Sequence, residues 1–400
     1  MKILLTTHHL KDFAGSELNT YDLALQLRAM GHKLTIATFQ YQDPIRSLFE
    51  KEKLDVVNLL EKKLSNKKYD LIWAQHFIVL NYVLFVEGVS APKVVYRSLS
   101  NYEPLEYPPS YTKELSLCLA ISKENKDFLL KEGFEKSKIV IFPNSVREEF
   151  FTNKQKANKE KITSIMIASN HIPTELLKAV NLLRKKRIKV DIYGLGHKFE
   201  HITPSLLGKY DVVVSIGRTV QYALAMGKPI FCYDRFGGPG YITNKNFEAA
   251  EKYNFSGRGF DRIMDHSEIT SEIINNYSKA IKYSKGLKDV CQDKFSLQRN
   301  ASQIFNRLEK SGSNVDLLAI KKQLTGIHKI TEIYASELRR SIERDKYIQK
   351  KEQDISEFKV RIKRQEKAIK DQSKIINQLK ERIASTIEGR IINLKRKVFN

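Results

Sequence analysis

The segment from residue 215 to residue 243 restricts the fold more than any other part of the chain. Its apolar pattern predicts a strand, a helix, a second strand and a glycine-bearing loop, in this order, over residues 212–216, 218–226, 230–233 and 237–240. The carboxyl ends of neighbouring parallel strands meet at one edge of an open sheet, where a helix N-terminus offers N–H groups to phosphate. The segment therefore predicts a phosphate-binding crevice in an α/β sheet. Glycines that only make tight turns are the alternative interpretation.

The first half of the chain repeats the alternation of strand and helix. Two strands, at 2–7 and 34–39, enclose a helix at 17–30, so the loop that carries Gly15 should lie at the crevice edge of a parallel sheet. Ser122 is the expected N-cap of a later helix. The further strands are expected at 69–74, 94–96, 117–121 and 139–142, and the helix that Ser122 caps is expected at 123–131.

His76 follows the strand at 69–74 directly. From a strand exit, its imidazole could bond a substrate hydroxyl or phosphate. A structural histidine is the competing interpretation.

The second half begins after a polar stretch at 146–160, which predicts an exposed linker. A new βα series, with a Gly194-Leu195-Gly196 turn, follows this linker. The strands of this series are expected at 162–168, 190–193 and 210–216, and its helix at 174–186. Two closing helices are expected at 268–284 and 295–309, and a short flexible break at 310–314.

The formal net charge of the chain is +23, and nearly half of it lies in residues 317–400, which contain 22 Lys and Arg against 11 Asp and Glu. Such a field attracts nucleic acid, acidic lipid headgroups or phosphorylated substrates. No helix-turn-helix, zinc-finger or aromatic RNA-binding pattern is present, so we expect no nucleic-acid partner.

The three cysteines, Cys118, Cys232 and Cys291, form no CxxC pair. This spacing predicts neither a disulfide framework nor a metal site.

The sequence also lacks an apolar run of about 18 residues and a signal peptide. We therefore expect a cytoplasmic protein.

Several stretches of the sequence together resemble nucleotide-sugar-dependent glycosyltransferases of family four. They are Ala14-Gly15-Ser16-Glu17, Gly31 to Ile36, AISKENKDFLLKEGF from Ala120, and KIVIFPNSV from Lys138. The resemblance covers about residues 1–310 and implies the GT-B arrangement, in which two Rossmann-like domains face each other. It also implies a nucleotide-diphosphate sugar as the substrate, without a separate cofactor or metal ion.

The resemblance implies that the second domain binds the nucleotide-sugar donor. Gly217 stands at the position where the family has a glycine that brings backbone amides close to the donor diphosphate. The chain also departs from the family. The two donor-site glutamates should fall near Val214 and Tyr222, and neither residue is acidic. The usual Arg and Lys after the first strand of this domain are replaced by the region of Ser169-Asn170-His171 and Thr174-Glu175.

The resemblance and the strand exits together give a set of candidate site residues. Arg218 and His76 are expected to be catalytic, and Glu17 and His76 to lie on the acceptor side. The expected donor-binding residues are Gly15, Ser16, His171, Gly194, Gly196, Gly217, Thr219, Gln221, Tyr222, Gly237 and Gly238. The expected domains are an acceptor-side domain (1–150), a donor domain (160–290), a closing helix (291–310), a coiled coil (317–389) and a basic amphipathic tail (390–400).

The favoured function is a transferase that moves a sugar to a bacterial surface polysaccharide or a lipid-linked glycan, with retention at the anomeric carbon. Two alternatives remain. One is a catalytically inactive GT-B scaffold that organises a glycan-synthesis complex, and the other is a sugar-nucleotide epimerase of the same architecture.

Isoleucine recurs every seven residues in the C-terminal part of the chain, at positions 348, 355, 362, 369, 376 and 383. This heptad pattern predicts a coiled coil and hence a homo-oligomer. The alternative is a lone charged helix or a helix packed on the body of the same chain. Beyond Gly389, bulky apolar residues alternate with cations, which suits contact with anionic lipid headgroups on the inner face of the plasma membrane. A frayed basic terminus is the alternative.

Overall fold

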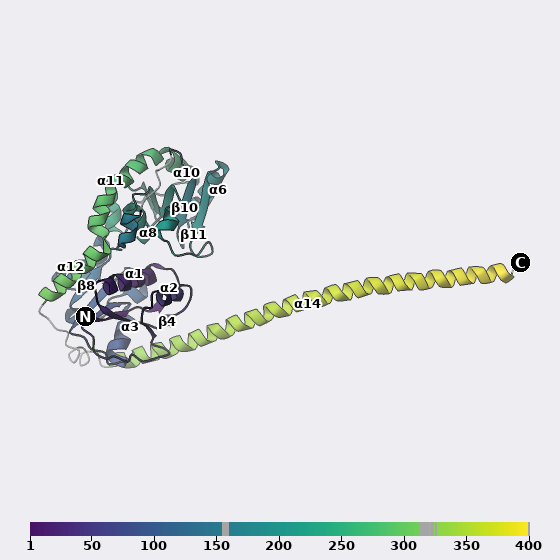
Figure 1. Cartoon of the computed structure of the whole chain (residues 1–400), viewed down its shortest axis with the longest axis horizontal. Coiled ribbons are helices and arrows are strands. Elements are labelled where there is room, and N and C mark those ends of the chain that lie inside the picture. Colours follow the sequence, from purple (N-terminus) through teal and green to yellow (C-terminus); the bar gives the residue numbers. More distant parts are fainter. Residues whose placement is uncertain (154–159, 312–319, 321–323, 325, 399–400) are drawn as a thin grey trace. The chain divides into compact units, whose positions relative to one another are not determined.

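The computed structural model describes residues 1–153, 160–311, 320, 324 and 326–398. Contacts between residues divide the chain into two units, Met1–Glu332 and Ile333–Asn400. The first unit contains two open sheets, each with its own helices, and we name these parts the first lobe and the second lobe (Figure 1).

The first lobe is built on a seven-stranded sheet in the order β5-β3-β1-β6-β7-β8-β9, in which all neighbours are parallel. The central strands are buried on both faces, as their continuous apolar runs predict. The strands are β1 (Lys2–Thr6), β3 (Lys33–Thr38), β5 (Val56–Asn58), β6 (Leu71–Gln75), β7 (Lys93–Ser98), β8 (Leu117–Ala120) and β9 (Ile139–Ile141). A separate two-stranded pair is formed by β2 (His9–Leu10) and β4 (Gln40–Tyr41).

The helices of the first lobe begin where local signals place them. Helix α1 (Gly15–Ala29) starts two residues before the expected helix, directly after Ala14. Helix α4 (Lys123–Lys131) has the expected bounds, and its N-cap Ser122 accepts a hydrogen bond from the backbone N–H of Asn125. The other α-helices of this lobe's sheet are α2 (Ile45–Lys51) and α3 (Phe77–Asn81). Helix α5 (Glu148–Thr152) occupies part of the expected linker and packs into the core of the second lobe through Phe150 and Phe151. Residues 154–159 of that linker lie outside the described residues.

The second lobe is built on a five-stranded sheet in the order β11-β10-β12-β13-β14. Helices α6 and α10 pack against each other over one face, and α8 and α11 over the other. The strands are β10 (Ser164–Ala168), β11 (Lys189–Tyr193), β12 (Val212–Ser215), β13 (Ile230–Asp234) and β14 (Gly237–Tyr241). The helices are α6 (Thr174–Lys185), α7 (Pro204–Leu207), α8 (Arg218–Ala225), α9 (Phe247–Lys252), α10 (His266–Asn275) and α11 (Tyr277–Phe295).

Two sequence predictions in this lobe are wrong. The glycine run 237–240 is not a loop but most of β14, which pairs antiparallel with β13 after a turn at Arg235 and Phe236. The run forms a strand because its glycines let other backbone segments approach: a Cβ atom on Gly238 would lie 2.2 Å from the carbonyl oxygen of Cys232. The single helix expected at 268–284 is instead the pair α10 and α11, which are separated at Asn276.

Helix α12 (Leu297–Lys310) returns to the first lobe. Its buried residues Leu297, Ile304 and Leu308 belong to the same core cluster as Ile3 and Trp73 of the first sheet. The chain therefore crosses back between the lobes at this helix.

Helix α14 (Ile327–Val398) is 72 residues long. It continues through Gly389, so residues 390–398, which were expected to form a separate basic tail, belong to the same helix. Residues 312–319, where the flexible break and the start of the coiled coil were expected, lie outside the described residues. Among the helices that the structure describes, none combines the length and the apolarity needed to cross a membrane.

Candidate functional site

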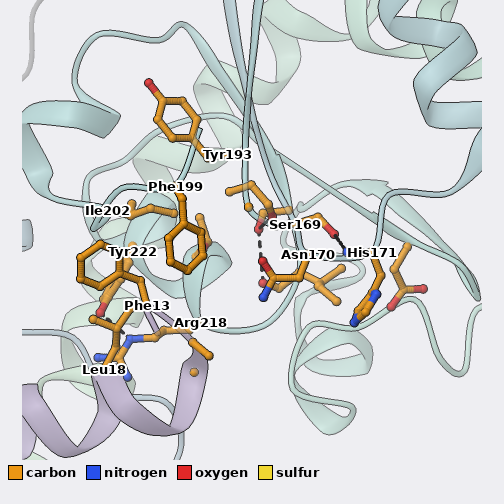
Figure 2. A pocket seen from close by; sticks show the side chains of 18 of the residues that line it. Phe13, Leu18, Ser169, Asn170, His171, Tyr193, Phe199, Ile202, Arg218 and Tyr222 are labelled. Carbon is orange, nitrogen blue, oxygen red and sulfur yellow. Dashed lines mark hydrogen bonds between the residues drawn. The ribbon is translucent and has the colours of Figure 1, made fainter. Parts of the chain in front are cut away.

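A cavity of about 450 Å³ lies at the carboxyl ends of β10, β11, β12 and β13, opposite the start of α1 (Figure 2). This is the crevice edge that the strand order predicts. It is lined by Phe13, Ala14, Gly15 and Leu18 from the first lobe and by Ala168, Ser169, Asn170, His171, Tyr193, Gly194, Phe199, Glu200, Ile202, Ser215, Ile216, Arg218, Thr219, Tyr222, Asp234, Arg235, Phe236 and Arg258 from the second. We name it the donor cavity.

Helix α8 begins at one wall of this cavity. Its N-cap Gly217 has φ 56° and ψ −133°, a conformation that glycine adopts without strain. The backbone N–H of Gly217 donates to the carbonyl oxygen of Phe255 at 3.1 Å, which fixes the turn. The N–H groups of Arg218 and Thr219 belong to the first helical turn, where no intrahelical acceptor exists, so this wall offers donors to an anion.

Arg218 is the central side chain of the site and is only 9% exposed. Its Nη2 donates to the carboxylate of Asp22 on α1, and its Nε donates to the hydroxyl of Tyr222. Burial disfavours the guanidinium charge, but Tyr222 and Asp22 outweigh this effect and raise the pKa of Arg218. Nη1 is buried and has no hydrogen-bond partner among the described residues. The two N–H groups of Nη1 therefore have no acceptor within the described part of the chain.

Asp22 joins the two lobes at this point. Besides Arg218, it accepts a hydrogen bond from the Tyr222 hydroxyl at 3.0 Å and forms an ion pair with Arg147 Nε at 3.2 Å. The ring of Tyr222 stacks on Phe150 with centroids 4.1 Å apart. These contacts hold Arg218 and Tyr222 in place.

Aromatic rings form other walls of the cavity. Phe13 of the first lobe stacks on Phe199 of the second, with ring centroids 5.5 Å apart (Figure 2). Phe236 is 42% exposed, and the guanidinium of Arg235 lies 4.9 Å from its ring centroid. The site therefore combines apolar faces with a few cations, as small-molecule sites commonly do.

The segment that replaces the usual Arg and Lys supplies neutral polar groups. Ser169 Oγ accepts from the backbone N–H of His171 at 3.1 Å (Figure 2). Asn170 Oδ1 accepts from the backbone N–H of Leu195, also at 3.1 Å. Gly194 lies against this segment, since a Cβ atom there would be 2.1 Å from the carbonyl oxygen of Ser169. The close approach explains why a glycine occupies this strand exit.

Six of the sequence-predicted site residues line the donor cavity: Gly15, His171, Gly194, Arg218, Thr219 and Tyr222. Eight are not among its lining residues: Ser16, Glu17, His76, Gly196, Gly217, Gln221, Gly237 and Gly238. Gly217 and Gln221 each line a neighbouring cavity instead. Gly237 and Gly238 are covered within the sheet, for the reason given for β14.

His76 is 3% exposed, and both of its ring nitrogens are engaged. Nδ1 accepts from the backbone N–H of His8 at 2.9 Å, and Nε2 lies 3.1 Å from a carboxylate oxygen of Glu106. This arrangement corresponds to the structural interpretation of His76 and leaves no nitrogen for a substrate. Glu17 is also fully buried, and burial raises the pKa of its carboxyl group.

Sequence reasoning missed Phe13, Phe199, Asp234, Arg235, Phe236 and Arg258 as cavity residues. Asp234 ends β13, and Arg235 and Phe236 follow it directly, so the strand-exit rule could have found all three if the turn had been predicted there. Phe13 and Phe199 meet only in the folded chain, and no local pattern indicates their contact. Within the part of the chain that the structure describes, no cluster of three or more His, Cys, Asp or Glu is arranged to hold a metal ion.

No protein-family model and no curated protein matches the sequence. Solved structures do match the fold. A structure of Alr3699/HepE from Anabaena in complex with UDP-glucose has a TM-score of 0.53 at 14% identity, over 78% of this chain and 100% of that one. TarM has a TM-score of 0.53 at 10% identity, over 77% and 98% of the two chains. A glycosyltransferase from Rickettsia africae ESF-5 has a TM-score of 0.50 at 15% identity, over 78% and 99%.

These neighbours are GT-B structures, and the chain has the GT-B fold. The resemblance read from the sequence is thereby confirmed at the level of the fold. Each alignment leaves about a fifth of the residues of this chain uncovered.

Proposed function

We propose that this protein is a glycosyltransferase that uses a nucleotide-diphosphate sugar as donor. The observation that carries the proposal is the unpartnered Nη1 of buried Arg218 beside the N-terminus of α8, within a cavity at the crevice edge of a GT-B fold. A buried charged donor without a partner is costly, and an anionic ligand would satisfy it. The known complex of Alr3699/HepE with UDP-glucose supports the same ligand class.

In this proposal the donor diphosphate lies against the N–H groups of Arg218 and Thr219 and against Arg218 Nη1. An acceptor hydroxyl oxygen forms a bond to the anomeric carbon, and the bond from that carbon to the diphosphate oxygen breaks. The electron pair stays on the diphosphate, which also takes up the proton of the hydroxyl. Arg218 and the start of α8 stabilise the negative charge that develops on the leaving group.

The position of Tyr222 in place of a glutamate changes what this site offers to the donor. A glutamate would add a negative charge, whereas the Tyr222 hydroxyl is neutral and its pKa is raised by burial. The hydroxyl also accepts from Arg218 and donates to Asp22. We therefore propose that the substitution leaves more of the positive charge of Arg218 for the donor diphosphate rather than abolishing the site.

Calorimetry with UDP, UDP-glucose, UDP-galactose, UDP-N-acetylglucosamine, GDP-mannose and dTDP-glucose tests the proposal. We expect one of these nucleotides to bind with a micromolar Kd. Absence of binding by every one would contradict the transferase and favour the inactive scaffold. Conversion of the bound sugar without an acceptor, detected by product analysis, would favour the epimerase.

The acceptor is proposed to be a bacterial surface polysaccharide or a lipid-linked glycan, and transfer is proposed to retain the anomeric configuration, as in the family that the sequence resembles. The ratio of anomers in the first product, measured by NMR before mutarotation, tests retention.

Helix α14 is proposed to pair with a second copy of itself. The six heptad isoleucines are each between 51% and 61% exposed in the single chain, although isoleucine is usually buried. A parallel pair would cover this stripe and bring two basic ends together.

Those ends are proposed to contact the anionic inner face of the plasma membrane. Ile391, Ile392 and Leu394 are about half exposed, and Lys395, Arg396 and Lys397 follow them. Apolar side chains beside cations suit a peripheral attachment.

A further inference from the structure

A second cavity, of about 210 Å³, adjoins the donor cavity at the same lobe interface. Ile216 and Arg258 line both cavities, so the two are separated only by the thickness of these side chains. The second cavity is formed by the segment that follows β7, the start of α4 and the segment at 253–258. We name it the Tyr102 chamber, and its polar lining residues include Ser100, Asn101, Tyr102, Ser122, Asn254 and Ser256.

The walls of the Tyr102 chamber offer hydroxyl and amide groups. Each of three serines accepts a hydrogen bond from the backbone of its own wall: Ser100 from Tyr102, Ser122 from Asn125 and Ser256 from Arg258, at 3.1 to 3.2 Å. A serine hydroxyl that accepts in this way keeps its own O–H to donate. The chamber can thus exchange several neutral hydrogen bonds with a ligand.

The chamber carries little net charge, although Glu124 and Arg258 line it. The guanidinium of Arg258 donates to both carboxylate oxygens of Glu124, from Nε at 3.2 Å and from Nη2 at 2.8 Å. The hydroxyl of Tyr102 also donates to Glu124, at 3.1 Å. Because these charges neutralise each other, the chamber favours a neutral polyhydroxyl ligand over a phosphate or a carboxylate.

Tyr102 itself is 65% exposed, which is unusual for a large aromatic side chain at the edge of a cavity. Its ring is held by the hydroxyl contact to Glu124 and by Arg258, whose guanidinium lies 5.0 Å from the ring centroid. A fixed aromatic face attracts the polarised C–H groups on one side of a sugar ring. Hydroxyl groups and an aromatic face together are the chemistry that recognises a saccharide.

A third cavity, of about 510 Å³, continues the chamber, since Ile121, Ser122 and Asn254 line both. Gln221 lines this third cavity and is 1% exposed. Its Nε2 donates to Asn254 at 3.4 Å, but its Oε1 has no partner among the described residues. A buried amide oxygen without a donor destabilises the folded protein, and a ligand hydroxyl would supply the missing donor.

We propose that the Tyr102 chamber and the third cavity bind the acceptor as a neutral saccharide, with the reacting hydroxyl toward Ile216 and Arg258. This inference rests on the proposed transferase function and replaces the acceptor side expected at Glu17 and His76. Helix α8 then contacts both substrates: Arg218 lines the donor cavity, and Gln221, three residues later, lines the acceptor side.

The test uses the full chain and its variants Tyr102→Ala and Gln221→Leu. The matched control is Tyr107→Ala, because Tyr107 is also an exposed tyrosine of the same segment but is not among the lining residues of the chamber. Saturation-transfer NMR in the presence of UDP measures binding of the methyl glycosides of glucose, galactose and N-acetylglucosamine and of cellobiose. Calorimetry with UDP measures the donor side separately.

We expect saccharide signals from the unmodified chain and from Tyr107→Ala. Saccharide affinity should fall at least tenfold in Tyr102→Ala and by a smaller factor in Gln221→Leu. The Kd for UDP should remain unchanged within about twofold in all four proteins. Saccharide binding that is equal in all four proteins, or undetectable in the unmodified chain, would overturn the proposal. If UDP does not bind but the saccharides bind in a Tyr102-dependent manner, the donor part of the proposed function fails while the saccharide site stands.

Discussion

The two units of the chain use their apolar residues in opposite ways. In Met1–Glu332, large side chains such as Trp73, Phe142 and Phe231 are at most 2% exposed, and the two sheets are covered by their own helices. In Ile333–Asn400, the heptad isoleucines of α14 are about half exposed. The first unit completes its core within one chain, whereas the second presents an apolar stripe that one chain leaves open. The chemistry should therefore depend on the first unit, and assembly on the second.

The largest expected effect is the loss of donor binding in Arg218→Met. This change removes the charged donor that faces the ligand, and a hydrogen bond to a charged group contributes about 1.5–3 kcal/mol. Together with the loss of charge opposite the diphosphate, we expect about a 100-fold increase in the Kd for the nucleotide, measured by calorimetry.

The matched control for this prediction is Arg361→Met, since Arg361 is an exposed arginine on α14. It should leave the Kd unchanged. Circular dichroism will report whether Arg218→Met folds, and Arg218→Lys should keep part of the affinity if the charge matters. A normal Kd in Arg218→Met would break the link between the first unit and the chemistry.

The next largest effect is expected from Ile369→Asp, which places a carboxylate in the apolar stripe of α14. If two stripes pair, two buried carboxylates would oppose each other in every dimer, and we expect about a 100-fold weaker dimer by analytical ultracentrifugation. Lys367→Asp adds the same group two residues earlier, outside the stripe, and should leave the dimer intact. Donor affinity should be the same in all three proteins. A full chain that is monomeric would remove the assembly role of α14.

A smaller effect should appear at membranes. We expect the full chain to sediment with anionic vesicles at low salt and to be released as salt rises from about 0.1 M to about 1 M, because the Debye length falls from about 10 Å to about 3 Å. A chain that ends at Lys310 should not sediment with the vesicles and should be monomeric by light scattering. Attachment that salt does not change would exclude the basic end as the cause.

The last prediction concerns acid stability. This effect should also arise in the first unit, since residues 333–400 contain no histidine. Burial lowers the pKa of His8 to about 3 and that of His201 to about 4, from the ordinary value of 6.5. The unfolded chain therefore binds more protons than the folded one between these values and pH 6.5. Stability should fall as pH decreases through this window, by about 1.4 kcal/mol per pH unit for each histidine.

Urea unfolding at pH 7 and pH 5, followed by the fluorescence of Trp73, the single tryptophan, measures this dependence. His201→Gln should reduce the difference between the two pH values. His197→Gln, which changes an exposed histidine nearby, should not. An unchanged difference in His201→Gln would show that the buried imidazole does not contribute.

Much of the fold could be predicted from the sequence because its signals are local. The apolar runs of β1, β10 and β12, the N-cap Ser122 and the position of Arg218 at a helix start all follow from residues adjacent in the chain. The heptad pattern likewise predicted a long helix in the region where the structure has α14.

The site was predicted less completely because its geometry depends on contacts between distant segments. Phe13 meets Phe199 across the lobes, and Asp22 holds Arg218 at a separation of 196 residues. His76 satisfied the strand-exit rule, but His8 and Glu106 occupy its two nitrogens. Residues 237–240 were predicted to be a loop because glycine and proline favour turns, whereas here Gly237 and Gly238 allow close backbone approach inside a sheet.

The contacts of Arg218 have a consequence for the entropy of binding. A free arginine side chain carries about 2 kcal/mol of rotamer entropy, which it would lose when a ligand immobilises it. Asp22 and Tyr222 already fix the guanidinium through Nη2 and Nε, so this loss occurs when the protein folds. The donor then meets a cation that is already oriented, and more of the contact energy is available as affinity.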